Sequence, residues 1–554
     1  MNKTYIYLFF IIILAFILRL YNVDKIPPSL YWDEAAIALD AKSISLTAKD
    51  HHGNFWLQPI FPSWGDYKLP GYILTATPFF KVLAGRIELA VRLPSVIAGT
   101  LTVLVVYFLI GELFKLSRFK DLISKPKNLI NAIALIASFL LATSPWHLQF
   151  SRAAFEGNLA LLFNSLALLF FLKAARKSQY LVLRIFWILA SLLLAILAIY
   201  TYYSARIVLP IILFIAFIFF WKRNVKNIFI FILFIGLFFG FTMPLRNSNL
   251  SAQANQLRLS TKNILSNEEI IIYSAKLIEQ DKDSFIARKI HHRFLYIGKQ
   301  LLFHYFDHFS LNFLILKGDN NLRHSTGRIG VLLFISAFGL IYGEYLFFKK
   351  NIKLFLFLNI CLLITFLPAA VPYEVPHALR SLNAVVFINI ISAYGLVQLF
   401  KLLKTKKKTF LLYIICLFFF IQFIFYLHDY YIHYPGRSFL DWQGGYKQAI
   451  KAVNKDYDRA DNVVFTNAYG RPYLYFLLYS DYSISKFQEY RQTILAQNPQ
   501  NYSETFNFDK ITFKNIEFEK DKKSNKVMLI GTPAELSTGD KIDNINNFKI
   551  WKNY

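Results

Sequence analysis

The sequence predicts a polytopic α-helical membrane protein. Of its 554 residues, 56% are hydrophobic and 18% are aromatic, and the mean hydropathy is +0.40, which is more apolar than a soluble chain of this length. Apolar runs of about sixteen or more residues recur from end to end, near the length at which a helix crosses about 30 Å of hydrocarbon. Both cysteines, Cys361 and Cys416, lie inside such runs, so no disulfide framework is implied.

About eleven membrane spans are expected, one for each long apolar run. They lie near residues 5–21, 89–111, 129–148, 159–175, 183–202, 207–222, 227–244, 329–348, 354–371, 384–403 and 409–427. The first run, YIYLFFIIILAFILRL, is too long for the core of a signal peptide and has no small-residue cleavage site after it. We therefore expect it to remain as an anchor.

The connections between these runs alternate in charge. One set is rich in lysine and arginine and reads KLSRFKDLISKPK, KAARKSQYLVLR, KRNVK, KKNIK and KLLKTKKK; the other, WHLQFSRAAFEGN, YYSAR and PYEVPHALRSLN, has a single arginine in each member. The positive-inside rule then places the N-terminus in the cytoplasm and the sparse loops outside. Because the number of spans is odd, the C-terminus is expected outside as well.

Three longer segments share that outer side, namely residues 22–88, the polar and helix-like residues 245–328, and residues 428–554. In the last segment YKQAIKAVNKDYD and RPYLYFLLYS have helical spacing, whereas NVVFTN and KVMLIGT are typical of strands. Such an alternation predicts a small α/β domain. We expect a transmembrane catalytic region over 1–427 and an extracytoplasmic domain over 428–554.

The formal net charge of +27 is also typical of proteins that bind nucleic acid. Here the basic residues are scattered through short connections and form no basic face on a soluble module. This distribution indicates charge that sets topology beside an anionic membrane. We expect a multi-pass protein of the cytoplasmic membrane with no nucleic-acid partner.

The adjacent acids Asp33 and Glu34 follow the first span in PPSLYWDEAAIALDAKS, beside Tyr31 and Trp32. Acids in the first turn of a helix are favoured by the helix dipole, which is the simplest explanation of the pair. Ionisable groups at membrane depth are costly, however, and usually serve function. We therefore expect this pair to belong to a site on the outer side.

Lys68 lies in WGDYKLPGY, where Pro70 and Gly71 indicate a turn before the next apolar run. A cation on such a turn can bind a lipid phosphate or simply extend toward headgroups. The motif DHHG at 50–53 contains residue types that bind metals. Adjacent histidines point in different directions on a strand or a helix, so we expect a solvated loop and no metal site there.

The remaining outer loops each contribute charged side chains. SPWHLQFSRAAFEGN carries Arg152 and Glu156, four residues apart and therefore expected on one helix face. The others contribute Arg206 from TYYSAR, Arg323 and His324 from GDNNLRHSTGR, and Glu374, His377 and Arg380 from YEVPHALRSLN. Each cation alone could be a headgroup anchor. Several on one face suit a phosphate ligand, because arginine binds phosphate through two parallel hydrogen bonds.

In this order, the motifs resemble those of the C-type (GT-C) glycosyltransferases of family 39 and its relatives, which include the dolichyl-phosphate-mannose protein mannosyltransferases and the lipid A aminoarabinose transferase. Asp33-Glu34-Ala35 resembles the acid pair of the family's first loop. YKLPGY resembles its lysine–proline segment, which more often runs Lys-Pro-Pro. RLPSVIAGTLTVLVVYFLIGELF, SPWHLQFSRAAFEGNLALLF and PHALRSLNAVVF are similar to later segments, although the family usually has Asp where this chain has Glu156. The likeness covers roughly residues 1–400.

The resemblance implies a polyprenyl-phosphate-linked sugar donor, a protein, lipid or glycan acceptor, and inversion in a single displacement on the outer side of the membrane. Asp33 would be the general base. The other residues would bind substrate: Lys68, Arg206, Arg380 and Arg323 at the phosphate leaving group, Glu34 and Glu156 at the donor or acceptor sugar, and His377 beside Arg380. This scheme requires no metal and no further cofactor.

Three other functions are kept as alternatives. The nearest is a ligase or polymerase that moves whole lipid-linked glycans. A lipid or polyprenyl transporter would have charges buried in mid-span and broken or repeated helices, whereas these spans are nearly free of charge at their centres and show no repeat. A scaffold with a partner-binding tail would leave the outer acids unexplained. No Walker loop, dinucleotide glycine motif, G-x-S-x-G or H-E-x-x-H motif is present.

Overall fold

The computed structural model of the chain describes residues 3–63, 66–117, 126–176, 180–247, 250, 252–254, 256, 264, 267–403, 409–497, 507–536 and 542–554. It forms two compact units. The helical unit comprises Met1–Tyr21 and Ser95–Tyr431, and the mixed unit comprises Asn22–Pro94 and Ile432–Tyr554. The segment after the first helix and the C-terminal part of the chain thus fold as one body. Parts of the basic connections, at 118–125, 177–179 and 404–408, lie outside the described residues.

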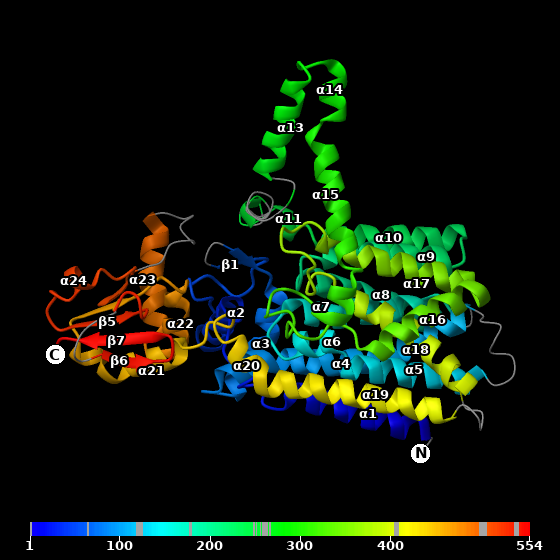
Figure 1. Ribbon diagram of the computed structural model, residues 1–554, viewed down its shortest axis with the longest axis horizontal. Helices are drawn as coiled ribbons and strands as arrows, with labels where there is room; N and C mark the ends of the chain where they lie inside the picture. Colours follow the sequence, from blue (N-terminus) through cyan, green and yellow to red (C-terminus); the bar gives the residue numbers. More distant parts are fainter. Residues whose placement is uncertain are drawn as a thin grey trace. The chain divides into compact units, whose positions relative to one another are not determined.

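Every expected span overlaps an apolar helix (Figure 1). These helices are α1 (Lys3–Leu20), α4 (Ile87–Ser117), α5 (Pro126–Thr143) with α6 (Pro145–Ser151), α7 (Glu156–Ala174), α8 (Leu181–Ile199), α9 (Ala205–Phe220), α10 (Val225–Phe241), α16 (Phe334–Lys350), α17 (Ile352–Phe366), α18 (Ala384–Leu403) and α19 (Thr409–His428). Among the described residues, eight helices are long and apolar enough to cross a membrane, and a ninth crossing results if the pair bent by 59° after residue 143 is one span. The count of eleven stays a prediction.

α18 lies at the centre of the helical unit, where it contacts α5, α16, α17 and α19. All of its residues from Ala384 to Val397 are buried. The contact with α16 is close because glycines line it: a Cβ on Gly395 would overlap the carbonyl oxygen of Gly339. Such close packing of small residues holds helices together where lipid supplies no hydrophobic driving force.

The connection between α10 and α16 is largely helical, as its sequence predicts. It contains α11 (Pro244–Asn247), α13 (Glu268–Gln280), α14 (Phe285–Ile290), α15 (Arg293–Asp307) and the π-helix η3 (Asn312–Leu316). α13 and α15 lie side by side as a hairpin closed by α14 (Figure 1). Asn267 caps α13 by accepting from the backbone N–H of Glu269. Most of residues 248–266 lie outside the described part of the chain.

The C-terminal part of the mixed unit is an α/β fold, as expected. Its five-stranded sheet has the order β4-β3-β5-β7-β6. The strands are β3 (Asn462–Phe465), β4 (Ile511–Phe513), β5 (Val527–Gly531), β6 (Ile542–Ile545) and β7 (Phe548–Lys552), and the helices are α20 (Tyr434–Arg437), α21 (Tyr446–Asp456), α22 (Pro472–Tyr479), α23 (Ile484–Gln497) and α24 (Phe518–Asp521). β3 runs parallel to β4 and β5, and β7 is antiparallel to β5 and β6. All four elements predicted in this segment, α21, β3, α22 and β5, are present.

The N-terminal part of the mixed unit contains α2 (Trp32–Thr47), the hairpin of β1 (Phe61–Ser63) and β2 (Asp66–Lys68), and α3 (Pro70–Val82). α2 packs against α3 and also against α22 of the C-terminal part. Most of its side chains are buried, including Glu34 and Asp40. A helix covered on all sides by protein is expected to be apolar all round, so its buried acids must each have a partner.

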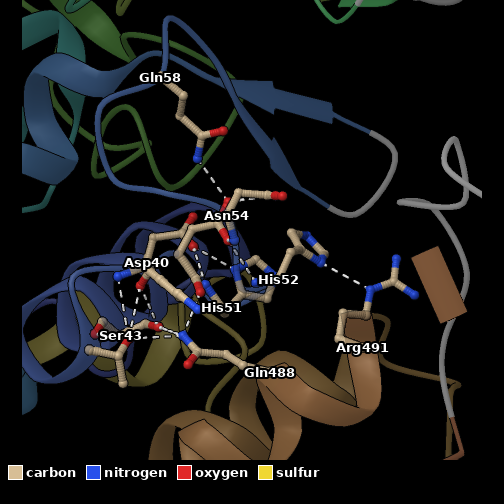
Figure 2. Close-up of polar contacts among 11 residues, drawn as sticks. Asp40, Ser43, His51, His52, Asn54, Gln58, Gln488 and Arg491 are labelled. Atoms are coloured by element: carbon tan, nitrogen blue, oxygen red, sulfur yellow. Dashed lines mark hydrogen bonds and ion pairs between the residues drawn. The ribbon is translucent and has the colours of Figure 1, made fainter. Parts of the chain in front are cut away.

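A buried polar network joins the turn after α2 to α23 (Figure 2). The Gln488 amide nitrogen lies 2.8 Å from Ser43 Oγ and 2.7 Å from the carbonyl oxygen of Asp50, and Arg491 Nε donates to His52 Nδ1 at 3.1 Å. Asp50, His51 and His52 are fully buried. The prediction of a solvated loop at DHHG is therefore wrong, because α23 covers this turn.

Candidate active site

Asp33 lies in the first turn of α2 and forms an ion pair with Lys68. Lys68 Nζ is 2.5 Å from Asp33 Oδ1 and 3.0 Å from Asp66 Oδ2. The Lys68 side chain is 6% exposed, whereas that of Asp33 is 26% exposed. Lys68 is held in place because it ends β2, and Pro70 begins α3 two residues later. The result is a partly open carboxylate next to a shielded cation.

Glu34 points away from this centre and pairs with Arg92, and both side chains are fully buried. Arg92 Nε and Nη2 each donate to one Glu34 carboxylate oxygen at 3.0 Å. The same guanidinium donates to the carbonyl oxygens of Val23, Pro27 and Ser29. Any contact of Glu34 with substrate would require this pair to open.

Arg471 also reaches Asp33, from the turn before α22. Its Nη1 lies 3.7 Å from Asp33 Oδ1, and its guanidinium lies 4.9 Å from the centre of the Trp32 ring. Neither Arg471 nor Arg92 is among the site residues that the sequence predicts. Arg92 lies in the quoted RLPSV segment, but its partner is 58 positions away. Arg471 is far from the other motifs in sequence, and no local pattern marks it.

The other predicted site residues, Glu156, Arg206, Arg323, His377 and Arg380, all belong to the helical unit. The segments that carry Glu156, Arg206 and Arg380 meet at Gly157. A Cβ on Gly157, the second residue of α7, would lie 2.8 Å from Leu379 Cδ1 and 3.6 Å from the Tyr202 ring. Glu156 therefore begins a helix that packs against the segments of Arg380 and Arg206. Arg206 lies over the ring of Tyr203 at 4.4 Å.

His377 packs against GDNNLRHSTGR, the segment that carries Arg323 and His324. The rings of His324 and His377 are 4.8 Å apart. Asp319 holds this contact, because its Oδ2 accepts from the Ala378 backbone N–H at 2.8 Å and lies 2.9 Å from His324 Nδ1. Burial, followed by the charges of His324 and Arg380, places the pKa of His377 well below its ordinary value. His377 is therefore neutral at physiological pH.

Asp319, His324 and His377 also have the residue types of a metal site, with ligand atoms within 4.8 Å of one another. The Asp319 oxygen nearest His324 already accepts two hydrogen bonds. These bonds explain the orientation of the carboxylate and of the His324 ring without a bound ion. The trio is the one such group among the described residues.

Arg152 does not share a helix with Glu156, because α6 ends at Ser151 and α7 begins at Glu156. The prediction of one common helix face is wrong. Arg152 is buried and donates to the carbonyl oxygens of Leu18 at 2.7 Å and Tyr21 at 2.8 Å. Its immediate role is to satisfy backbone carbonyls at the C-terminus of α1, which the helix leaves without partners.

In overall fold the chain is similar to solved membrane glycosyltransferases. No protein-family model matches it, and no curated protein matches its sequence. The Archaeoglobus fulgidus oligosaccharyltransferase with a tethered acceptor peptide has a TM-score of 0.52 and 15% identity, over 86% of this chain and 63% of its own. AglB from the same organism, solved with an inhibitory peptide and a dolichol-phosphate, has a TM-score of 0.52 and 14% identity, over 97% of this chain and 70% of its own. ArnT from Cupriavidus metallidurans bound to undecaprenyl phosphate has a TM-score of 0.48 and 10% identity, over 100% of this chain and 98% of its own.

At these identities the likeness concerns the fold. The chain spans roughly two thirds of the length of the archaeal oligosaccharyltransferase, with 63% covered in one structure and 70% in another. The chain has the fold of the GT-C glycosyltransferases, the superfamily that its motifs resemble.

Proposed function

We propose that the protein is a membrane glycosyltransferase that moves a sugar from a polyprenyl-phosphate-linked donor to an acceptor on the extracytoplasmic face of the cytoplasmic membrane. The observation that carries the proposal is the pair of a partly exposed Asp33 and a shielded Lys68. Sugar transfer from a phosphate needs a base for the attacking group and a cation for the departing phosphate. The GT-C fold supports the same class of reaction.

In the proposed reaction, Asp33 accepts the proton of the acceptor nucleophile as that nucleophile attacks the anomeric carbon. The bond between this carbon and the phosphate oxygen breaks, and its electron pair leaves with the polyprenyl phosphate. The configuration at the anomeric carbon inverts because attack and departure occur on opposite sides. Lys68 stabilises the growing phosphate charge. For this, it must exchange the Asp33 carboxylate, now 2.5 Å away, for a phosphate oxygen.

The cations of the helical unit, Arg206, Arg323 and Arg380, are proposed to bind the anionic part of the lipid-linked donor, with neutral His377 as a hydrogen-bonding neighbour. Glu156 is proposed to bind a sugar hydroxyl. Guanidinium groups suit phosphate because their N–H donors match its oxygens in pairs. The scheme uses no metal and no cofactor beyond the lipid-linked sugar. The dolichol-phosphate in the AglB structure supports a polyprenyl phosphate as the lipid partner.

The isosteric variant Asp33→Asn tests the base. It keeps the shape of the side chain and removes its ability to accept a proton, so transfer from a polyprenyl-phosphate donor in membranes should fall by about 10²- to 10⁴-fold. The matched control is Asp66→Asn, which removes the other carboxylate bound to Lys68 and should retain most activity. Near-normal turnover by Asp33→Asn would show that another group is the base.

Transfer of a whole glycan is the second candidate, because two of the similar solved structures, each with a TM-score of 0.52, are oligosaccharyltransferases. Mass spectrometry of the acceptor separates the two functions. A mass increase of one sugar supports the single-sugar transferase, and an increase of a complete oligosaccharide supports the ligase or polymerase.

A further inference from the structure

We infer that Arg471 is a substrate-binding residue of the Asp33 centre, supplied by the C-terminal α/β fold, and that it takes a phosphate oxygen of the donor. The inference rests on the proposed function of that centre. It gives the C-terminal part of the chain a direct task in the reaction, in addition to its structural one.

The first argument is the unmet hydrogen-bonding capacity of Arg471. Its side chain is only 16% exposed and extends toward Asp33 Oδ1, but the Nη1–Oδ1 distance of 3.7 Å is too long for a hydrogen bond. Nη1 is buried and forms no hydrogen bond to any described residue. A buried guanidinium N–H is costly without an acceptor. A phosphate oxygen next to Asp33 would supply that acceptor.

The second argument is the backbone at this position. Arg471 has φ 55° and ψ 39°, in the left-handed region that non-glycine residues rarely occupy. It also precedes Pro472, which ordinarily favours extended backbone at the preceding residue. Strained residues of this kind persist where the surroundings hold them, and they are concentrated at binding and catalytic sites. Here the strained backbone directs Arg471 over Trp32 toward Asp33.

The third argument is that the turn carrying Arg471 is fixed to the start of α2. Tyr446 donates to the carbonyl oxygen of Gly470 at 2.8 Å and stacks on Tyr475 with ring centres 4.1 Å apart. Tyr475 in turn donates to the carbonyl oxygen of Leu30 at 3.0 Å. The network of Gln488 shown in Figure 2 adds a second attachment of the same fold to α2. Arg471 is thus presented by a rigid frame.

The charges around Asp33 balance one another, so an anionic ligand would bind here by taking cations from Asp33. Two carboxylates, Asp33 and Asp66, face two cations, Lys68 and Arg471, and both cations lie nearest to the same oxygen, Asp33 Oδ1. A phosphate that binds both cations would compete with Asp33 for them. The Asp33 carboxylate would then lose its partners and become a stronger base. Donor binding would therefore prepare the base for the acceptor.

Equilibrium binding to the full-length protein in detergent tests the inference. The probes are undecaprenyl phosphate and undecaprenol, which share a chain and differ by the phosphate. Arg471→Gln should weaken undecaprenyl phosphate binding by about tenfold or more, as expected for a lost hydrogen bond to a charged group, and should leave undecaprenol binding unchanged. The matched control is Arg459→Gln, in the same fold, whose side chain is 76% exposed; it should change neither affinity.

Wild-type affinity of Arg471→Gln for undecaprenyl phosphate would overturn the inference and leave the proposed function intact. If the glutamine variant does not fold, Arg471→Lys decides. Lysine keeps the charge but loses the planar fork of donors, so affinity should fall several-fold, and unchanged affinity would overturn the inference. Failure of the proposed function looks different, because the wild-type protein would then bind undecaprenol as tightly as its phosphate.

Discussion

Replacing Glu34 by glutamine should destabilise the folded protein, whatever its effect on sugar transfer. Glu34 and Arg92 are both fully buried, and each carboxylate oxygen of Glu34 accepts a hydrogen bond from Arg92 at 3.0 Å. Removing one partner of a buried ion pair costs about 3–5 kcal/mol, because the other charge is left in a medium of low polarity. Three backbone carbonyls still bind Arg92, so we expect the lower end, about 3 kcal/mol.

Thermal unfolding of the purified protein in detergent measures this effect. Glu34 and Arg92 both belong to the mixed unit, which is the size of a domain of about 150–250 residues. In such domains each kcal/mol shifts Tm by about 2–4 °C, so Glu34→Gln should lower the Tm of this unit by roughly 6–12 °C. The neighbouring Asp33→Asn variant is the control. Asp33 is 26% exposed and Lys68 retains Asp66 as a partner, so its Tm should fall by less.

A double-mutant cycle with Arg92→Gln makes the test specific. Because the two side chains act as one pair, the cost of the double variant should be well below the sum of the two single costs. A wild-type Tm for Glu34→Gln combined with lost sugar transfer would refute the reasoning. It would show that the Glu34 charge serves the substrate, as the sequence resemblance implies, and not the fold.

Two further predictions concern other parts of the structure. Burial, followed by the nearby Asp40 carboxylate, raises the pKa of Asp50 to about 6 from an ordinary value of 3.8, so the folded state holds this proton more tightly than the unfolded state. As the pH falls from 7 to 5, the free energy of unfolding of the wild type should rise relative to that of Asp50→Asn by up to about 1.4 kcal/mol per pH unit. Thermal unfolding of both proteins should show this as a widening Tm difference, and a constant difference would contradict the shifted pKa. Gly395→Leu should reduce the free energy of unfolding by at least about 1–3 kcal/mol, seen as a lower Tm, or prevent folding, because its side chain would enter the contact with Gly339. The control is Gly236→Leu on α10, where an added Cβ meets nothing within 4 Å, and it should fold normally.

Several contacts of the candidate site join residues that are far apart in sequence, so local sequence patterns do not predict these contacts. Asp33 and Lys68 are both in recognisable motifs, so the sequence predicts that each has a role, but their 2.5 Å ion pair depends on how α2 and α3 pack. Arg471 adds a cation from more than 400 positions away. Glu34 has the same sequence signal as Asp33, yet it faces Arg92 in a buried pair. Neighbouring positions on a helix point in different directions, and only packing decides which side is covered.

Hydrophobic periodicity and run length are local properties that decide whether a segment forms a helix or a strand, and they are enough to predict the apolar helices and the α/β character of the C-terminal part. The burial of individual polar groups, in contrast, depends on packing between distant segments. DHHG is buried because α23 covers it, and Arg152 serves the end of α1 because a break separates it from α7. The physical reason is that the free energy of a polar side chain depends on what surrounds it and which partners it finds, and both are set by segments distant in the chain.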